Sequence, residues 1–359
     1  MCGTIRSLKI THFKSIDVLE LHDLQPFSVF AGPNGSGKSN FFDALDFVSK
    51  ILRFGAEEAI RQYGGVENMR CRRAEKSNQN FEFEMETFVE SFNATYQKIL
   101  FICHYQLVLE NLSTEPLLKE QIKISFFDEE KKEYLPLNDQ DNRINDLKKA
   151  VKQQLANLRI YRIDPVSAKF PSLSSYDSTQ LHERGENLAA VLHRFTEYPD
   201  FLETISEWLE LVVPSFQKLK THTESLTGST VLALQEQGVE KPFPAHLISD
   251  GTVYLLCLLA AVLPIRALVL IEEPERGLHP KAIQELVTLF REKAIGQHRI
   301  WLSTHSETVV RALHKEELWL VDKDSNGITQ MKKAKIPDHI PLSIDQMWLS
   351  NGLNGGLPW

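Results

Sequence analysis

Eight consecutive residues could bind phosphate: Gly32, Pro33, Asn34, Gly35, Ser36, Gly37, Lys38 and Ser39, with Asn40 directly after them. They match G-x-x-x-x-G-K-[ST], in which the glycines allow backbone N–H groups to turn towards phosphate oxygens. Lys38 would neutralise the β- and γ-phosphates, and Ser39 would give a hydroxyl ligand to Mg²⁺. An apolar strand pattern (27–31) precedes the loop and helical spacing (40–52) follows it, as this chemistry requires. The loop therefore predicts binding of ATP with Mg²⁺.

A pair of carboxylates follows a second apolar segment. Leu268 to Ile271 reads as a buried strand, and Glu272 and Glu273 come next. Such a strand ends at the carboxyl edge of the sheet, where open α/β folds bind ligands. One carboxylate can hold Mg²⁺, and the other can orient the attacking water or accept its proton. A solvated acidic turn is the alternative for this pair.

Two further candidate sites are supported only weakly when each is considered by itself. Ser249 and Gly251 stand at the start of an apolar helix and could bind an anion, although Ser-Asp is also an ordinary N-cap. His305 ends the apolar strand of Trp301 to Thr304, and a lone histidine is more often structural. The order of the four features along the chain (phosphate loop, serine turn, acid pair, histidine) favours one nucleotide site.

The sequence resembles ABC-type ATPases of the SMC/RecF-like branch, including the ATPase parts of OLD (overcoming lysogenization defect) proteins. The resemblance covers roughly 1–70 and 180–335. It is carried by LKITHFKSI, GPNGSGKSN, LHERGENLAAVL, LISDGTVYLLCLLAAVL, LVLIEEPERGLHP and WLSTHS.

The resemblance implies a role for each of these residues. Gly32 to Ser39 would be Walker A, and Ser249 and Gly251 would lie in the signature, here ISDGT. Glu272 would be the Walker B acid and metal ligand, and Glu273 the catalytic glutamate. Residues 275–279 would form the D-loop, and His305 would sense the γ-phosphate. Such ATPases work as two heads packed head to tail, each ATP lying between one head's Walker A and the other's signature.

The sequence departs from the family pattern at several positions. Asp250 and Thr252 stand where transporters have glycine and glutamine, which favours the SMC/RecF branch. Glu272 replaces the commoner aspartate, and we expect slow hydrolysis. The Q-loop glutamine stays unassigned among Gln62, Gln79 and Gln106. Lys14, in the segment FKSI, is either a phosphate contact or a surface lysine.

Composition limits the class of protein. The 359 residues carry a net charge of −8, so a surface devoted to nucleic acid is not expected, and any such contact would use a local basic patch or a partner. The four scattered cysteines indicate a reducing cytoplasm without a zinc site or disulfides. The apolar run Val253 to Ile271 reads as helix, turn and strand rather than a membrane span. Three basic clusters read as solvated faces: Arg70, Arg72 and Arg73; Lys148, Lys149 and Lys152; Lys332, Lys333 and Lys335.

The expected fold is an α/β ABC-ATPase head: a P-loop mixed sheet flanked by helices, an antiparallel β subdomain and a helical insertion. We expect four parts: an N-terminal lobe (1–110), a helical or charged insertion (111–215), a C-terminal lobe (216–335) and a tail (336–359). Residues 81–110 read as antiparallel strands. For 111–150, which is charged and weakly patterned, we expect insertions and one helix, near 142–157. Further elements are expected as helices at 186–196, 199–212 and 280–293 and a hairpin of 216–224 with 229–237.

Three functions fit the motifs. The first is a homodimeric or larger ATP-gated switch that controls a separate effector, a nuclease or toxin, in antiphage defence or DNA repair. Asp322-Lys323-Asp324 reads as part of a hairpin turn rather than a Toprim metal site, so nuclease activity would come from a partner. The alternative is the ATPase subunit of an ABC transporter, against which stands the long spacing of Ser39 and Ser249. The third is a scaffold that binds ATP without hydrolysing it.

Overall fold

The computed structural model describes residues 5–73, 80–92, 98–110, 116–128, 133–137, 143–173, 178–264, 267–295, 298–337 and 342–357. A central six-stranded sheet has the order β16-β15-β3-β14-β13-β8. All its strands run parallel except β16, which pairs antiparallel with β15. The strands are β3 (Phe27–Ala31), β8 (Arg159–Tyr161), β13 (Leu268–Glu272), β14 (Arg299–Thr304), β15 (Leu318–Lys323) and β16 (Thr329–Lys333).

The central sheet is buried on both faces, as parallel sheets usually are. β3 (FSVFA) and β14 (RIWLST) are buried along their whole length, including polar residues such as Ser28 and Arg299. Val29 and Ala31 of β3 face a core shared with α7 (Asp250–Val262), α8 (Pro280–Lys293) and α9 (Glu307–Arg311). Phe30 faces the opposite core, which is shared with α1 (Lys38–Phe54). Helices on both faces therefore fix the carboxyl edge of the sheet.

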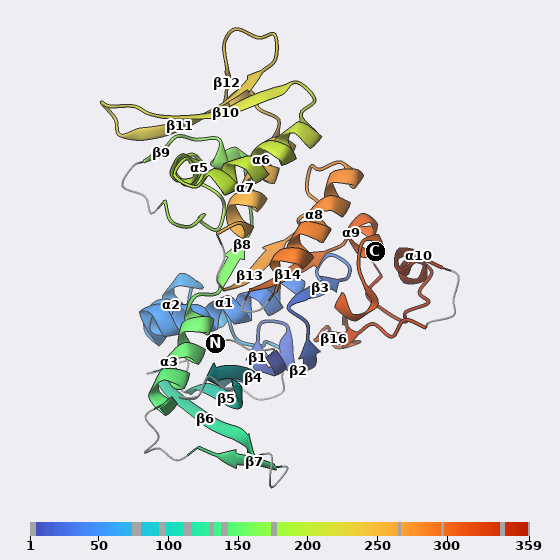
Figure 1. Ribbon diagram of the computed structural model, residues 1–359. Helices are drawn as coiled ribbons and strands as arrows, with labels where there is room; N and C mark the ends of the chain where they lie inside the picture. Colours follow the sequence, from blue (N-terminus) through green and yellow to red (C-terminus); the bar gives the residue numbers. More distant parts are fainter. Residues whose placement is uncertain are drawn as a thin grey trace.

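A second six-stranded sheet, order β2-β1-β4-β5-β6-β7, is antiparallel throughout. Its strands β6 and β7 lie at the lower end of the molecule in Figure 1, below α3 (Arg143–Ala156). The predicted helix near 142–157 is confirmed as α3, whereas the segment before it, where we expected insertions, contributes β6 and β7 to this sheet. The strands are β1 (Ile5–Phe13), β2 (Ile16–Leu24), β4 (Phe81–Phe92), β5 (Lys98–Glu110), β6 (Leu117–Asp128) and β7 (Glu133–Pro136).

A third, smaller sheet lies at the other end of the molecule (Figure 1). It contains the hairpin of β10 (Phe216–Thr223) and β11 (Ser229–Glu236), with β9 (Ser172–Leu173) and β12 (Phe243–Pro244) paired to β11. Helices α5 (Leu188–Phe195) and α6 (Pro199–Val212) pack between this sheet and α7. The predicted helices at 186–196 and 199–212 and the predicted hairpin are confirmed.

Three short helices complete the chain: α2 (Ala56–Gln62), α4 (Pro165–Ala168) and α10 (Ile344–Leu349). The apolar run from Val253 forms α7 and β13 as predicted, although Arg266 inside it lies outside the described residues. In the described ranges, no helix has both the length and the apolar character needed to cross a bilayer. The proposed division at 110, 215 and 335 stays a prediction, and β8 of the central sheet comes from its second part.

Candidate functional site

The phosphate-binding loop connects β3 to α1 at the carboxyl edge of the central sheet. Its glycines are needed for different reasons. Gly35 has a φ of +78° with open space around it, whereas Gly37 has a φ of +107° and lies against Thr329 of β16. A Cβ on Gly37 would lie 1.9 Å from Thr329 Oγ1, which itself donates to the carbonyl of Ser36 at 3.0 Å. The first residue of β16 therefore fixes the shape of this loop.

Lys38, the first residue of α1, is turned back into the loop. Its Nζ donates to the carbonyl oxygens of Gly32 (2.7 Å) and Pro33 (2.8 Å), and the residue is only 7% exposed. Burial lowers the pKa of the Lys38 ammonium, and the carboxylates of Glu273, Glu275 and Glu272 oppose that effect. The side chain is thus a desolvated cation with acidic neighbours.

Ser39 and Glu272 meet where a metal would be shared between the loop and the acidic strand. Ser39 Oγ donates to Glu272 Oε2 at 3.0 Å, joining α1 to the end of β13 across 233 residues of sequence. A hydroxyl and a carboxylate are hard oxygen donors of the kind Mg²⁺ takes, with phosphates and water filling its other positions. In keeping with so sparse a site, no group of three or more His, Cys, Asp or Glu side chains in the described ranges could hold a metal alone. These two residues therefore fit Mg²⁺.

Asn40 serves the loop from its other side. Its Nδ2 donates to Ser15 Oγ at 2.6 Å, and Ser15 Oγ lies 2.6 Å from Thr329 Oγ1. Ser15 belongs to the turn between β1 and β2, so the turn, the loop and β16 share one hydrogen-bond network. Asn40 therefore supports the loop, and its predicted contact with the nucleotide stays a prediction.

Glu273 lies beside His305, with Oε1 3.3 Å from His305 Nδ1. Glu273 has a φ of +50°, an unusual conformation for a residue with a side chain, and one often stored at active sites. Its N–H donates to the carbonyl of Ser303 at 2.9 Å, and the Tyr254 hydroxyl of α7 donates to its carbonyl at 2.8 Å. Contacts from both neighbouring elements therefore fix the backbone of Glu273 in this conformation, beside the histidine.

Glu275 is a buried carboxyl beside this pair that the sequence did not single out on chemical grounds. Its Oε1 accepts from Thr304 Oγ1 at 2.6 Å and from the His305 N–H at 3.4 Å. Burial raises the pKa of Glu275, although the hydrogen bond from Thr304 opposes that effect. Glu275 therefore helps to fix the backbone of Thr304 and His305.

Ser249 and Gly251 occupy the start of α7, and the predicted N-cap is present. Ser249 Oγ accepts from the N–H of Thr252 at 3.1 Å, and Ser249 is exposed. Gly251 packs against the D-loop turn so closely that a Cβ would lie 2.3 Å from the carbonyl oxygen of Gly277. Lys38, Ser39, Glu272, Glu273 and His305 thus come together in one site, whereas the signature serine faces outwards.

Three charged side chains at this site were missed or left open by the sequence. Arg162 follows β8 and contacts both Glu272 and Asp43. Lys14 donates to the other oxygen of Asp43 at 2.5 Å and lies over the Tyr63 ring, so it is neither a bare surface lysine nor directed at the loop. Burial lowers the pKa of Arg162, but Glu272 and Asp43 raise it more, so the net shift is upward. The only sequence signal was that Arg162 follows a short apolar stretch.

The other predicted features lie elsewhere in the chain. Gln62 donates to Glu58 on α2, and Gln106 lies within β5; Gln79 is outside the described residues. The hairpin interpretation of 322–324 is confirmed, since Asp324 Oδ1 accepts from the N–H groups of Asn326 and Ile328. Cys71, Cys103 and Cys257 are buried and form no disulfide among the described residues, and Cys2 is outside them.

Members of each basic cluster contact groups of the protein itself. Arg70 pairs with Glu67, Lys152 with Glu120, and Lys332 with the carbonyl of Asn354. These contacts are typical of an ordinary charged surface.

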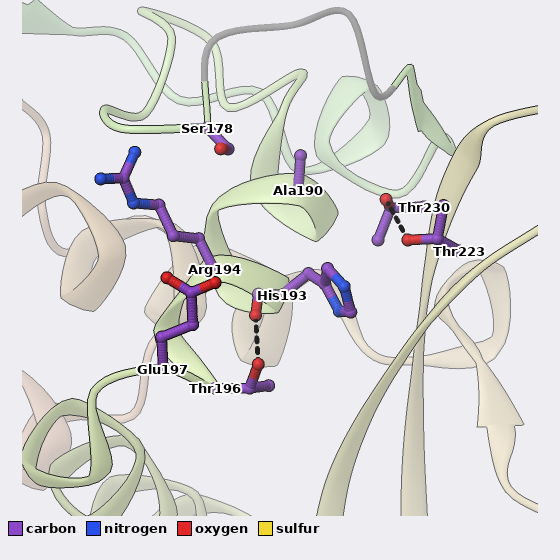
Figure 2. A pocket seen from close by; sticks show the side chains of 8 residues that line it. All are labelled: Ser178, Ala190, His193, Arg194, Thr196, Glu197, Thr223 and Thr230. Atoms are coloured by element: carbon purple, nitrogen blue, oxygen red, sulfur yellow. Dashed lines mark hydrogen bonds between the residues drawn. The ribbon is translucent and has the colours of Figure 1, made fainter.

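A separate polar hollow of about 320 Å³ lies between α5 and the β10–β11 hairpin (Figure 2). Arg194 and Glu197 lie near each other on one side of it, and the Thr223–Thr230 hydrogen bond (3.0 Å) closes the other. The neighbouring opposite charges of Arg194 and Glu197 make the hollow a poor anion site. None of the nucleotide-site residues lines it.

Comparison with known proteins agrees with this geometry. The chain has the fold of the structure titled "Crystal structure of the SmcHead bound to the C-winged helix domain of ScpA" (TM-score 0.57, 12% identity, 91% of this chain and 96% of that one). It is equally similar to an Smc head domain from Pyrococcus furiosus with an extended coiled coil, bound to the C-terminal domain of ScpA (TM-score 0.57, 14% identity, 99% and 100%). No curated protein matches the sequence significantly.

A family model described as "AAA domain, putative AbiEii toxin, Type IV TA system" matches residues 27–98 and 109–311, which is well over half of the chain. The matched ranges include the phosphate-binding loop, the signature turn, the acid pair and His305. The protein therefore belongs to this family of ATPase-type AAA domains and has the fold of an SMC ATPase head.

Proposed function

We propose that the protein binds ATP with Mg²⁺ at the loop of Gly32 to Ser39 and hydrolyses it between two copies packed head to tail. The observation that carries the proposal is the meeting of Ser39 with Glu272 at 3.0 Å, beside the Glu273–His305 pair at 3.3 Å. In this proposal Ser39 and Glu272 are the metal ligands and Glu273 is the base, and all of them lie near the phosphate-binding loop. This is the arrangement that phosphoryl transfer to water needs.

Each residue has a distinct task in this proposal. Lys38 exchanges the carbonyl oxygens of its own loop for phosphate oxygens. Glu273 orients the attacking water and accepts its proton, while His305 holds the Glu273 carboxylate and contacts the γ-phosphate. Bound Mg²⁺ neutralises charge that develops on the phosphates. Glu272 is longer than the usual aspartate, and we expect slow turnover.

A second copy is needed because Ser249 is exposed and, among the described residues, its hydroxyl contacts Thr252 of its own helix rather than the phosphate-binding loop. Its hydroxyl and the free N–H groups at the start of α7 form a donor set for an anion carried by another copy. ATP would therefore act as the bridge between two heads. Such a dimer closes when ATP binds and opens after hydrolysis.

We further propose that this cycle controls a separate effector, a nuclease or toxin, in bacterial antiphage defence or DNA repair. The family description, with its reference to a toxin–antitoxin system, supports the defence setting. The similar Smc heads were crystallised with a domain of ScpA, which makes an ATPase head working with a partner protein a reasonable precedent. The resemblance to OLD ATPases points in the same direction.

Phosphate release and ATP-dependent dimerisation test the proposal together. Wild-type protein should dimerise with ATP and release phosphate. Lys38→Ala should lose nucleotide binding, because no other side chain of the loop carries a positive charge. Glu273→Gln should bind ATP, release at least about 100-fold less phosphate and accumulate as a dimer, because the base is absent. Equal phosphate release by wild type and Glu273→Gln would remove Glu273 as the base, and ATP-independent dimerisation would remove the switch.

A further inference from the structure

Arg162 holds carboxylates from three different elements at the nucleotide site. Its Nε donates to Glu272 Oε1 at 3.0 Å, Nη2 to Asp43 Oδ1 at 2.5 Å, and Nη1 to Glu183 Oε1 at 3.0 Å. The planar guanidinium directs its N–H groups along fixed directions, so the three contacts set the relative positions of all three acids.

Glu272 needs such a support more than an aspartate would. A glutamate side chain has one more rotatable bond, so its carboxylate samples more positions and loses more entropy when it must meet a metal at one point. In this structure both oxygens are engaged: Oε1 with Arg162 and Oε2 with Ser39. Arg162 therefore holds Glu272 Oε1, the oxygen that is not hydrogen-bonded to Ser39.

The same arginine also sets the distance between Glu272 and Ser39. Asp43 lies on α1, four residues after Ser39, and its second oxygen is held by Lys14 at 2.5 Å. By binding Asp43 and Glu272 together, Arg162 connects the end of β13 to the helix that supplies the metal-binding hydroxyl. Both partners are largely buried (side-chain exposure 11% for Asp43, 17% for Glu272), so solvent screens this connection only weakly.

We propose that Arg162 is a positioning residue that fixes the Glu272 carboxylate for magnesium, compensating for the extra length of the glutamate. The inference rests on the proposed binding of Mg²⁺ and ATP. Lysine at this position would keep the charge but would not hold three carboxylates in one plane. Loss of a partner that orients a metal ligand typically weakens metal binding about 10–100-fold.

The test is a magnesium titration of the binding of a non-hydrolysable fluorescent ATP analogue. Arg162→Lys should raise the Mg²⁺ concentration for half-maximal binding about tenfold, while binding in excess EDTA stays as in wild type. The matched control is Arg159→Lys, at the start of β8, the strand that Arg162 follows; this arginine donates to Gln180 and to backbone carbonyls instead. It should leave the Mg²⁺ requirement within about twofold of wild type.

A second background separates positioning of Glu272 from a general structural role. In Glu272→Asp the shorter side chain no longer reaches Arg162, so adding Arg162→Lys should change the Mg²⁺ requirement by less than about threefold. Glu183→Gln provides a milder variant should Arg162→Lys melt early, and it should raise the requirement by about two- to threefold, since one of three anchors is lost.

An unchanged Mg²⁺ requirement in Arg162→Lys and Glu183→Gln overturns the inference. An equal effect of Arg162→Lys in the wild-type and Glu272→Asp backgrounds overturns it as well. Failure of the wild-type protein to bind the analogue at all would instead overturn the proposed function, so the two failures are distinct.

Discussion

The contact between Gly37 and Thr329 allows a quantitative prediction, because Gly35 in the same loop is a matched control. Both glycines have a positive φ, and an alanine there costs about 1 kcal/mol in backbone strain. At Gly35 the new Cβ meets nothing within 4 Å. At Gly37 it would lie 1.9 Å from Thr329 Oγ1 and 2.9 Å from its Cβ, so Thr329 has to move.

Moving Thr329 breaks its hydrogen bonds with the Ser36 carbonyl (3.0 Å) and with Ser15 Oγ (2.6 Å). At about 1 kcal/mol each, these add about 2 kcal/mol to the strain at Gly37. The loop can relax when no nucleotide is bound, but it must return to this shape around phosphate. We therefore expect the free-energy cost of the substitution to appear as a higher dissociation constant for ATP. Gly37→Ala should thus bind ATP about 30-fold more weakly than Gly35→Ala.

The assay is an equilibrium titration with a fluorescent ATP analogue, with thermal melting to verify that both variants fold. Thr329→Ala supplies a further check, because it has already lost the two hydrogen bonds and most of the clashing atoms. Adding Gly37→Ala to it should cost only about 1 kcal/mol more, a coupling of about 2 kcal/mol. Affinities of Gly35→Ala and Gly37→Ala within about threefold of each other would refute the reasoning.

Two other predictions concern the dimer and the buried acid. Ser249→Ala should bind ATP as wild type but dimerise at least about tenfold more weakly, whereas Ser343→Ala, which loses a similar cap on α10, should leave dimerisation unchanged; sedimentation with and without ATP measures both. Glu275→Gln should stabilise the protein by about 1 kcal/mol at pH 8, because burial of the Glu275 carboxylate is unfavourable. Since the pKa of Glu275 is raised, the folded state holds its proton more tightly than the unfolded one, and wild-type stability falls as pH rises through that pKa. The gain in melting temperature should therefore shrink towards acid pH, and a gain that is constant with pH would contradict this origin.

The sequence predicted the elements that have a strong pattern. β3, α6 and α8 begin and end where the apolar runs and helical spacing placed them. β6 was missed because its first half, including Lys119 and Glu120, is exposed and has no strand pattern. The alternation of apolar residues is confined to Ile122, Ile124 and Phe126, which pack against the core, and is too short to have stood out in a charged segment.

The site was predictable as far as its residues form local motifs. Lys38, Ser39, Glu272, Glu273 and His305 follow strands that end at one edge of a parallel sheet, so their meeting could be expected. Arg162 could not be found in this way, because its partner Asp43 lies 119 residues earlier and neither belongs to a motif. Likewise, no pattern in the sequence connects Thr329, the first residue of β16, with the shape of the phosphate-binding loop.

The Tyr254 hydroxyl has a consequence for the timing of the two sites in the proposed dimer. It lies on the helix whose first residues would grip the neighbouring head's nucleotide, and it holds the carbonyl of the same head's Glu273. A displacement of α7 caused by the neighbouring head would therefore be transmitted to Glu273 of the same head through the Tyr254 side chain. Because thermodynamic coupling is reciprocal, each head would report its nucleotide to the other. Tyr254→Phe should leave two heads that bind ATP together but cleave it independently.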